Sequence, residues 1–190
     1  ATSEFSLQTY YNRESFRWPQ VEATNDTFDV EFQHRMAPLD RHDFIWGAGY
    51  RLNSDDVKSN FSLSVEPGRR TEQVFNAFAQ DEITLIPDTL RLTLGSKFEH
   101  NGYSGVEVQP SARLLWTPVA DHTFWTAVSR AVRTPSRAED DIRFVQAIQP
   151  GPGGLAVTVE PTGQRGFDSE DLVAFEAGYR TSLAANLSFD

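Results

Sequence analysis

The stretch Thr89-Leu-Arg-Leu-Thr-Leu-Gly-Ser-Lys-Phe-Glu-His100 decides the fold class. Successive side chains of a β-strand point to opposite sides, so Leu90, Leu92, Leu94 and Phe98 fall on one face of an extended chain. The threonine, arginine, lysine and glutamate residues of the stretch fall on the other face. This period of two predicts a strand with one apolar and one polar side.

The same alternation recurs along the chain, for example over Phe28–Met36 and Val173–Tyr179. No segment shows a helical period of 3.6 residues over more than about two turns. A further strand begins near Asn186. The fold class is therefore predicted to be all-β, an antiparallel up-and-down meander of about eight to nine strands. The eight complete strands are predicted at Phe5–Phe16, Thr27–Met36, His42–Leu52, Gln73–Thr84, Thr89–His100, Val106–Trp116, His122–Val132 and Glu170–Thr181.

The strand lengths and connections favour a membrane barrel over a soluble sheet. Strands of about 10 to 12 residues match the reach of a tilted strand that crosses a bilayer. Every second link is tight, and the others are longer except 101–105, which predicts short turns at one rim and long loops at the other. We treat Val57–Val65 as structure inside a loop, because an extra strand there would invert this order. The predicted links are 17–26, 37–41, 53–72, 85–88, 101–105, 117–121, 133–169 and 182–185.

Composition narrows the class of protein. The 190 residues suffice for one ordinary domain, and the net charge of -10 argues against nucleic-acid binding. The longest nearly unbroken apolar stretch, Phe44–Tyr50, is far shorter than the roughly 20 residues of a spanning helix. Lys58 and Lys97 are the only lysines, so the positive charge is almost all arginine, which suits bidentate carboxylate pairs.

Aromatic and charged residues are placed as expected for a barrel wall. Trp116, Phe124 and Trp125 flank a predicted turn, and we interpret them as an interfacial girdle; filling of a soluble core is the alternative. Charges of both signs share the polar rows and would line a lumen, or else the solvated face of an ordinary sheet. These residues are Asp29, Glu31, Arg35, Arg91, Lys97, Glu99, Arg113, Glu176 and Arg180.

The sequence contains no pattern typical of a catalytic or metal site. His34, His42, His100 and His122 lie on four different predicted strands, without ligand spacing and without a cysteine partner. The acidic run Glu139–Asp141 lies in the longest predicted loop and is interpreted as solvated. We therefore expect no enzyme, no metal site and no cofactor.

Several motifs resemble the barrel of TonB-dependent outer-membrane receptors. Trp125–Arg137 is similar to a late-barrel strand that ends in an Arg-x-Pro-Ser element, and Phe175–Arg180 is similar to the strand after the next outer loop. Phe75–Glu82 followed by Leu90–Asn101 resembles a family hairpin. The resemblance covers almost the whole chain. It implies that residues 1–190 are a partial β-barrel domain from a barrel of about 22 strands, with the plug domain and TonB-binding box absent.

The resemblance further implies a receptor in the bacterial outer membrane. Such a receptor imports a ferric siderophore, or otherwise cobalamin, haem or another metal complex, and would contact outer-membrane lipid and, through the missing plug, TonB. Arginine and aromatic groups at the outer loops suit an anionic, ring-bearing chelate, although solvation of the loops is the alternative. The predicted ligand-binding residues are Arg17, Trp18, His100, Tyr103, Arg133 and Arg137.

Two rival hypotheses remain open at this stage. One is a soluble lipocalin-like barrel of eight strands, whose apolar rows would point inward around a small apolar ligand. The other is a structural β-sheet protein without a ligand. If the chain is an isolated fragment, we expect self-association or closure into a smaller barrel, because unpaired sheet edges and an apolar face associate readily.

Overall fold

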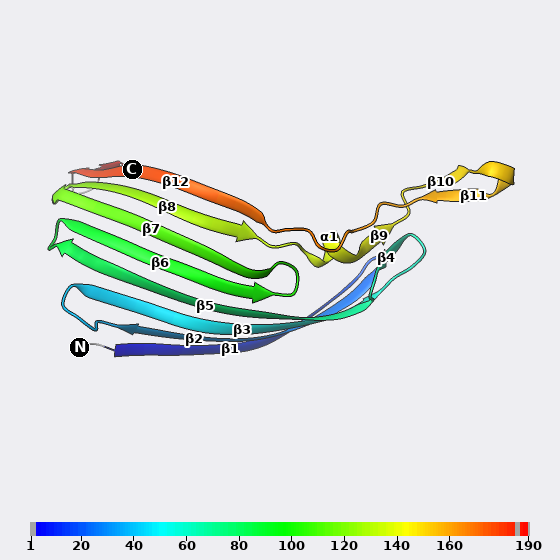
Figure 1. The fold of residues 1–190 in the computed structure, drawn as a ribbon, viewed down its shortest axis with the longest axis horizontal. Coiled ribbons are helices and arrows are strands. Elements are labelled where there is room, and N and C mark those ends of the chain that lie inside the picture. Colours follow the sequence, from blue (N-terminus) through cyan, green and yellow to red (C-terminus); the bar gives the residue numbers. More distant parts are fainter. Residues whose placement is uncertain (1–2, 185–186, 190) are drawn as a thin grey trace.

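The computed structural model describes residues 3–184 and 187–189, and most of them belong to one antiparallel sheet (Figure 1). Its nine strands lie in the order β1-β2-β3-β5-β6-β7-β8-β12-β13, so each strand pairs with the next strand of the sheet along the chain. This confirms the all-β meander and places the ninth strand after Asn186. The strands are β1 (Ser3–Arg17), β2 (Glu22–Met36), β3 (His42–Lys58), β5 (Arg69–Ile86), β6 (Leu90–Asn101), β7 (Gly105–Val119), β8 (His122–Arg133), β12 (Glu170–Ala184) and β13 (Leu187–Phe189).

Short elements lie in two of the links, outside the main sheet. β4 (Leu63–Val65) pairs with β9 (Ile142–Phe144), which confirms that this part of the 53–72 link is structure within a loop. The excursion between β8 and β12 also contains the five-residue helix α1 (Arg137–Asp141). Its tip is a hairpin of β10 (Ala147–Pro150) and β11 (Ala156–Val159), with the helical turn η1 (Pro152–Gly154) between them. Figure 1 shows this hairpin projecting away from the sheet.

The pairing register separates the two faces of the sheet as the alternation predicts. On one face the apolar rows meet across strands, as Phe98 does with Ala77 and Val108. Among the described residues, Ala23 is the one buried hydrophobic residue, whereas Phe175 is 81% exposed. The apolar rows therefore do not meet inside a core, and a soluble lipocalin-like barrel is not supported.

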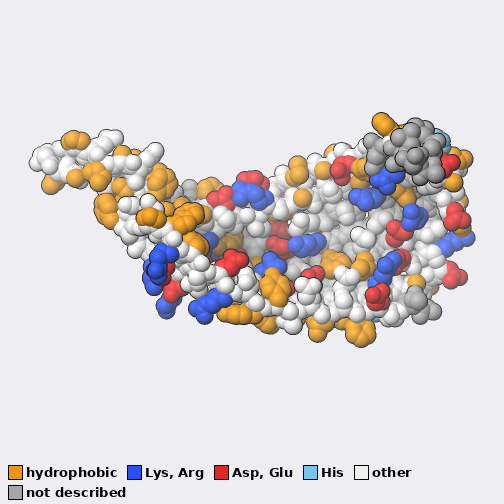
Figure 2. Space-filling view, turned by 180° about the vertical axis from the view of Figure 1, so that it is seen from behind, with side chains coloured by type: hydrophobic (Ala, Val, Ile, Leu, Met, Phe, Trp, Pro, Cys, Tyr) orange, Lys and Arg blue, Asp and Glu red, His pale blue; other side chains and the backbone are white. Residues whose placement is uncertain are grey.

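The opposite face carries the predicted charged rows and is hollowed. Asp29 lies beside Arg51, Lys97 beside Gln109, and the nine predicted lumen residues all fall on this inner face. Figure 2 shows charges of both signs over the hollowed face and hydrophobic side chains along its lower margin. In the described part of the chain, no helix has both the length and the hydropathy that crossing a membrane requires.

The links differ from prediction because the strands continue past their apolar segments. The predicted link 17–26 is a tight turn at 18–21, and the link 53–72 shortens to 59–68. Polar pairs extend the ladder in these places, such as Ser15 with Thr24 and Thr27 with Asn53. The predicted difference between the rims is therefore carried mainly by 59–68 and 134–169. The predicted link 182–185 lies partly outside the described residues.

One aromatic prediction is wrong. Trp116 and Phe124 do face outward, and their ring centroids lie 5.4 Å apart. Trp125 instead lies on the inner face, where the guanidinium of Arg113 lies 5.8 Å from its ring centroid. Adjacent residues of a strand point to opposite sides, so Phe124 and Trp125 cannot share a girdle. The indole lies over Gly178, where any Cβ would overlap it.

The sheet is open, with β1 and β13 as its two edge strands in the described part of the chain. The side of β1 that faces away from β2 presents a row of backbone N–H and C=O groups that are available for pairing. Self-association or closure of an isolated fragment rests on these edges and stays a prediction.

Candidate ligand site at the loop rim

One hollow over the inner face lies at the rim with the long loops, where α1 returns over the sheet. Its volume is about 710 Å³, within the range of about 300 to 1,000 Å³ that is typical of small-molecule sites. The floor comes from the ends of β2, β3, β5 and β6, and one side comes from residues 134–142. Residues that line it include Arg51, Asn53, Asp55, Arg70, Glu72, Asn101, Tyr103, Pro135, Arg137 and Ile142.

The first turn of α1 is fixed by its own sequence. Ser136 is the N-cap: its side chain accepts from the backbone N–H of Glu139 at 3.4 Å, and the Glu139 carboxylate accepts from the backbone N–H of Ser136 at 2.8 Å. Arg133 at the end of β8 bonds to Glu139 at 2.8 Å and to Glu170 of β12 at 2.6 Å. These bonds, from Arg133 first and then from Ser136, lower the pKa of Glu139 to about 2. The loop thus leaves the sheet in a defined direction.

Behind this turn lies a cluster of six charged residues. The side chain of Asp141 is fully buried, and the guanidinium groups of Arg70, Arg137 and Arg165 approach it to 2.8, 3.0 and 3.1 Å. Arg70 also lies 3.0 Å from Asp140. A buried carboxylate is costly unless it is paired, so the three arginines are what allows Asp141 to be buried here. We call Asp55, Arg70, Arg137, Asp140, Asp141 and Arg165 the rim cluster.

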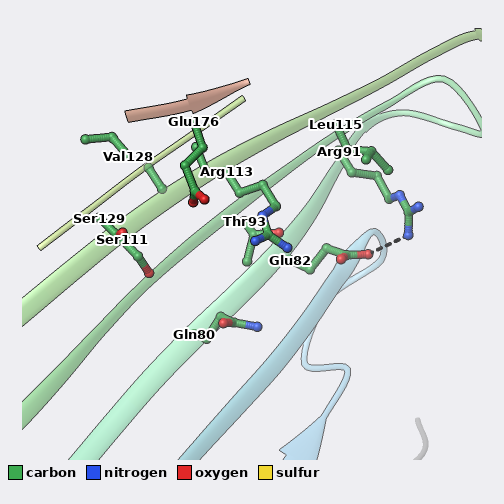
Figure 3. Close-up of a pocket in the computed structure, with 12 residues that line it drawn as sticks. Gln80, Glu82, Arg91, Thr93, Ser111, Arg113, Leu115, Val128, Ser129 and Glu176 are labelled. Carbon is green, nitrogen blue, oxygen red and sulfur yellow. Dashed lines mark hydrogen bonds and ion pairs between the residues drawn. The ribbon is translucent and has the colours of Figure 1, made fainter. Parts of the chain in front are cut away.

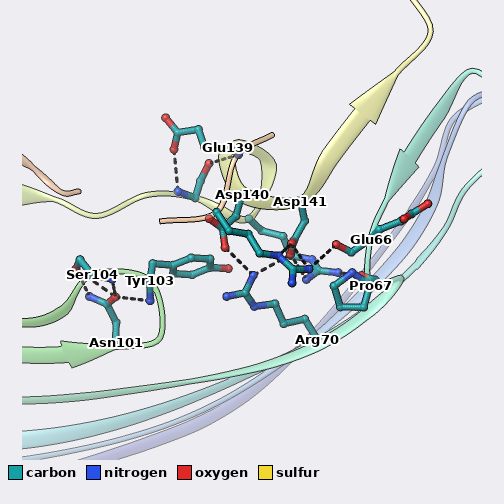
Figure 4. Close-up of polar contacts among 12 residues, drawn as sticks. Glu66, Pro67, Arg70, Asn101, Tyr103, Ser104, Glu139, Asp140 and Asp141 are labelled. Carbon is teal, nitrogen blue, oxygen red and sulfur yellow. Dashed lines mark hydrogen bonds and ion pairs between the residues drawn. The ribbon is translucent and has the colours of Figure 1, made fainter. Parts of the chain in front are cut away.

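The rim cluster joins the two long loops. The backbone N–H of Glu66 donates to the carbonyl of Asp141 at 3.0 Å, and Arg165 donates to the carbonyl of Glu66 at 3.0 Å. Arg137 donates to the carbonyl of Pro67 and lies 2.8 Å from Asp55 of β3. Together with the β4–β9 pair, these contacts make one unit of residues 59–68 and the root of the 134–169 excursion (Figure 4).

Tyr103 provides the aromatic surface of the hollow. Asn101 holds the β6–β7 turn, because its side-chain oxygen accepts from the backbone N–H groups of Tyr103 and Ser104, each at 2.9 Å. The guanidinium carbon of Arg70 lies 4.4 Å from the centroid of the Tyr103 ring, in cation–π geometry. Burial, and then the neighbouring carboxylate of Glu72, raise the pKa of Tyr103 to about 12. Its hydroxyl therefore stays protonated at neutral pH.

Each arginine that lines the hollow has a carboxylate partner. Arg51 on the floor donates to Asp29 at 2.8 Å, Arg70 bonds to Asp140 and Asp141, and Arg137 bonds to Asp141. The site thus offers guanidinium and amide donors, carboxylates and one aromatic face. This mixture suits an oxygen-rich ligand with rings.

A second hollow lies further along the inner face, over β5 to β8 and β12 (Figure 3). It measures about 360 Å³. Arg91 lies 3.0 Å from Glu82 there, and Arg113, Thr93 and Glu176 point into the same space. All its lining residues belong to strands of the sheet, so its polar groups form a feature of the wall. In the described part of the chain, no group of histidines or acidic residues has the arrangement of a metal site.

The structure brings two of the six predicted ligand-binding residues together, Tyr103 and Arg137, with Arg70 between them. Arg133 lies at the root of the loop, where it bonds Glu139 and Glu170, and it does not line the hollow.

The other three predicted residues lie away from the hollow. Arg17 pairs with Glu22 across the β1–β2 turn, Trp18 is 68% exposed, and His100 is on the outer face opposite Phe75. A ligand-binding role for the six residues stays a prediction.

Sequence reasoning did not find Arg70, Asp140 or Asp141 as residues of the site. The acidic run was visible, but its interpretation as solvated is wrong for Asp140 and Asp141, which are buried and paired with arginine. The preference for arginine over lysine was also visible. The sequence does not reveal that Arg70 lies beside Asp140 and Asp141, which follow it in the chain at separations of 70 and 71 positions. No local pattern in the sequence carries that information.

The whole chain, residues 1–190, matches the family model described as TonB dependent receptor-like, beta-barrel. The chain belongs to this family. TonB-dependent receptors are transporters rather than enzymes. A search of curated protein sequences found no match.

Several solved receptors have a similar fold. A mutant of the ferric enterobactin receptor PfeA from Pseudomonas aeruginosa, in complex with enterobactin, has a TM-score of 0.73 and 19% identity over 98% of this chain and 31% of that chain. The siderophore receptor PirA from Acinetobacter baumannii has a TM-score of 0.66 and 14% identity over 85% of this chain and 25% of that chain. PirA from Pseudomonas aeruginosa has a TM-score of 0.65 and 13% identity over 96% and 37%. The chain therefore spans between 25% and 37% of the length of these receptors.

Proposed function

We propose that the chain is part of the wall of a bacterial outer-membrane receptor that imports a ferric siderophore. The observation that carries the proposal is the division of the sheet: apolar rows are exposed on one face, while the other is charged and hollowed beneath the long loops. A wall between lipid and a polar lumen requires this division. The family match and the receptors of similar fold agree with it.

The ligand would bind first in the rim hollow. Tyr103 offers a ring face and a neutral hydroxyl, and Arg70 and Arg137 offer guanidinium groups for anionic oxygens. Asn53 and Asn101 add amide groups at the floor. PfeA, whose barrel has a similar fold, was solved with enterobactin, so a catecholate chelate is the first ligand to try.

Transport would also require parts of the receptor beyond these residues. We propose that a plug domain fills the lumen, couples import to TonB, and contacts the polar inner face around Arg91 and Arg113. The chain itself would act as wall and ligand surface, with no enzymatic role.

Uptake of radioactive iron tests the proposed function. Cells that lack the gene should take up less iron from ferric enterobactin or from another ferric siderophore, and the wild-type gene should restore uptake. Arg70→Gln should restore it poorly, whereas Arg69→Gln should restore it fully, because Arg69 is exposed and pairs with Asp56 outside the hollow. Unchanged iron uptake from every ferric siderophore in the deletion strain would contradict the proposal.

A further inference from the structure

The cations of the rim hollow are already occupied by carboxylates of the chain itself. Arg70 donates through the same nitrogen, Nη1, to Asp140 at 3.0 Å and to Asp141 at 2.8 Å. Arg137 donates to Asp141 at 3.0 Å. An anionic ligand that approaches Arg70 Nη1 would therefore meet a nitrogen whose two hydrogens already bind carboxylates.

The two aspartates reach Arg70 from α1, which forms one side of the hollow (Figure 4). A carboxylate and the anionic oxygen of a chelate bind a guanidinium through the same N–H groups. The aspartates and such a ligand therefore exclude each other at Arg70 Nη1.

Asp141 has a second partner outside the hollow, which matters for an exchange. Its Oδ2 atom faces Arg70 and Arg137, whereas its Oδ1 atom accepts from Arg165 at 3.1 Å. Arg165 does not line the hollow. If Asp141 leaves Arg70, its charge keeps one arginine and is not left unpaired, which lowers the cost of the exchange.

We propose that Asp140 and Asp141 are an internal competitor of the ligand. The anionic oxygens of the ligand displace the two carboxylates from Arg70 and Arg137, and α1 is released from the rim as they leave. This inference rests on the proposed function, because it takes a ferric siderophore as the ligand.

The position of α1 and the affinity for the ligand are then coupled, because the ligand binds when the aspartates have left the arginines. The paired arrangement reduces the apparent affinity by the fraction of molecules in which the arginines are available. Weakening the aspartates should therefore tighten binding. A purely structural role for the aspartates would give the opposite sign, since a loosened loop would bind less well.

The test uses the intact receptor in detergent, with ferric enterobactin as the probe and ferrichrome and ferric citrate as hydroxamate and carboxylate alternatives. Quenching of tryptophan fluorescence reports Kd. We expect Asp141→Asn to lower Kd about five- to tenfold and Arg70→Gln to raise it at least about tenfold. Asp168→Asn is the matched control, because it removes the same charge from an exposed position in the same excursion, and it should leave Kd unchanged.

Loop release is measured separately by the rate of trypsin cleavage after Arg137. Cleavage should be faster in ligand-free Asp141→Asn than in wild type, and faster in wild type once the probe is bound. Asp140→Asn replaces Asp141→Asn if the latter does not fold, since it removes one carboxylate from Arg70 and leaves the contacts of Asp141 in place.

The outcomes separate the two proposals. Binding by wild type with equal or weaker binding by the aspartate variant overturns the internal competitor and leaves the proposed function standing. Failure of wild type to bind any of the three probes, together with unchanged iron uptake in the deletion strain, overturns both.

Discussion

The root of the excursion between β8 and β12 and its tip are held by different forces. The root, residues 134–144 and 160–169, is tied to β3 and β5 by the rim cluster and to the 59–68 link by the pairing of β4 with β9. The tip, residues 147–159, contains no charged residue, and its strands β10 and β11 pair with each other. Leu155 at the tip is 72% exposed.

The difference shows what can order a loop on a barrel wall. A wall of this kind has no hydrophobic core on which a loop could pack, because its apolar side chains are on the outer face. Buried ion pairs to the strand ends take that role at the root. A two-stranded hairpin alone is marginally stable in water, so the tip depends on the root for its position.

Replacement of Arg70 should have the largest effect on the stability of the root relative to the tip. In Arg70→Ala, Asp140 loses its arginine and Asp141 loses one of three, so the free energy of opening of α1 should fall by about 2 kcal/mol. Amide hydrogen exchange of residues 137–142 measures this. Arg69→Ala, whose side chain is exposed and pairs with Asp56, should change exchange little. Equal exchange in both variants would show that the ion pairs do not hold the root.

The titration of Tyr103 gives a second, smaller effect. Its pKa is raised from 10.0 to about 12, first by burial and then by Glu72, so folding favours the neutral hydroxyl. This contribution to stability is complete below pH 10.0 and is lost as the pH rises through about 12. The ultraviolet titration of wild type minus that of Tyr103→Phe isolates the group. A difference curve centred near pH 10.0 would mean that the ring is not covered by the loops.

Acid should loosen the start of α1 through Glu139. The pKa of this carboxyl is lowered from 4.5 to about 2, chiefly by Arg133, so its ionised form stabilises the root. The contribution is complete above pH 4.5 and is lost as the pH falls through about 2. The protection factors of the Ser136–Asp140 amides, which correct for the pH dependence of intrinsic exchange, should therefore fall over this range. In Glu139→Gln these protection factors should be lower at neutral pH and show no further fall in this window.

Shortening the tip should have the smallest effect. Ala147 and Val159 are cross-strand partners, so an Asn-Gly turn can join them in place of residues 148–158. Because the tip has no ion pair to the sheet in the described part of the chain, α1 should keep its opening free energy within about 0.5 kcal/mol. Amide exchange of α1 is the measurement. Faster exchange in the shortened protein would show that the tip, too, helps to hold the root.

Both the accuracy and the limits of the sequence predictions have physical causes. The faces of β6 and β7 followed from alternation alone, because the backbone of a strand fixes the side of each residue. The start of β2 was placed too late, at Thr27 instead of Glu22, because Thr24 and Asn25 belong to a polar ladder with β1 outside the apolar segment. Trp125 was assigned to the girdle by its proximity to a turn. The register of β7 with β8 places Trp125 on the same face of the sheet as Arg113, which is the inner face.

The amino-acid sequence by itself determined the class of fold, the two faces of the wall and the place of the long excursion. These depend on a period of two residues and on turn length, both of which are local properties of the backbone. Only the tertiary structure decided that Arg70 meets Asp140 and Asp141, and that Tyr103 and Arg137 share one hollow while Arg17 and His100 do not. Contacts between distant segments depend on strand register and on the path of the returning loop, and the sum of many weak interactions sets both.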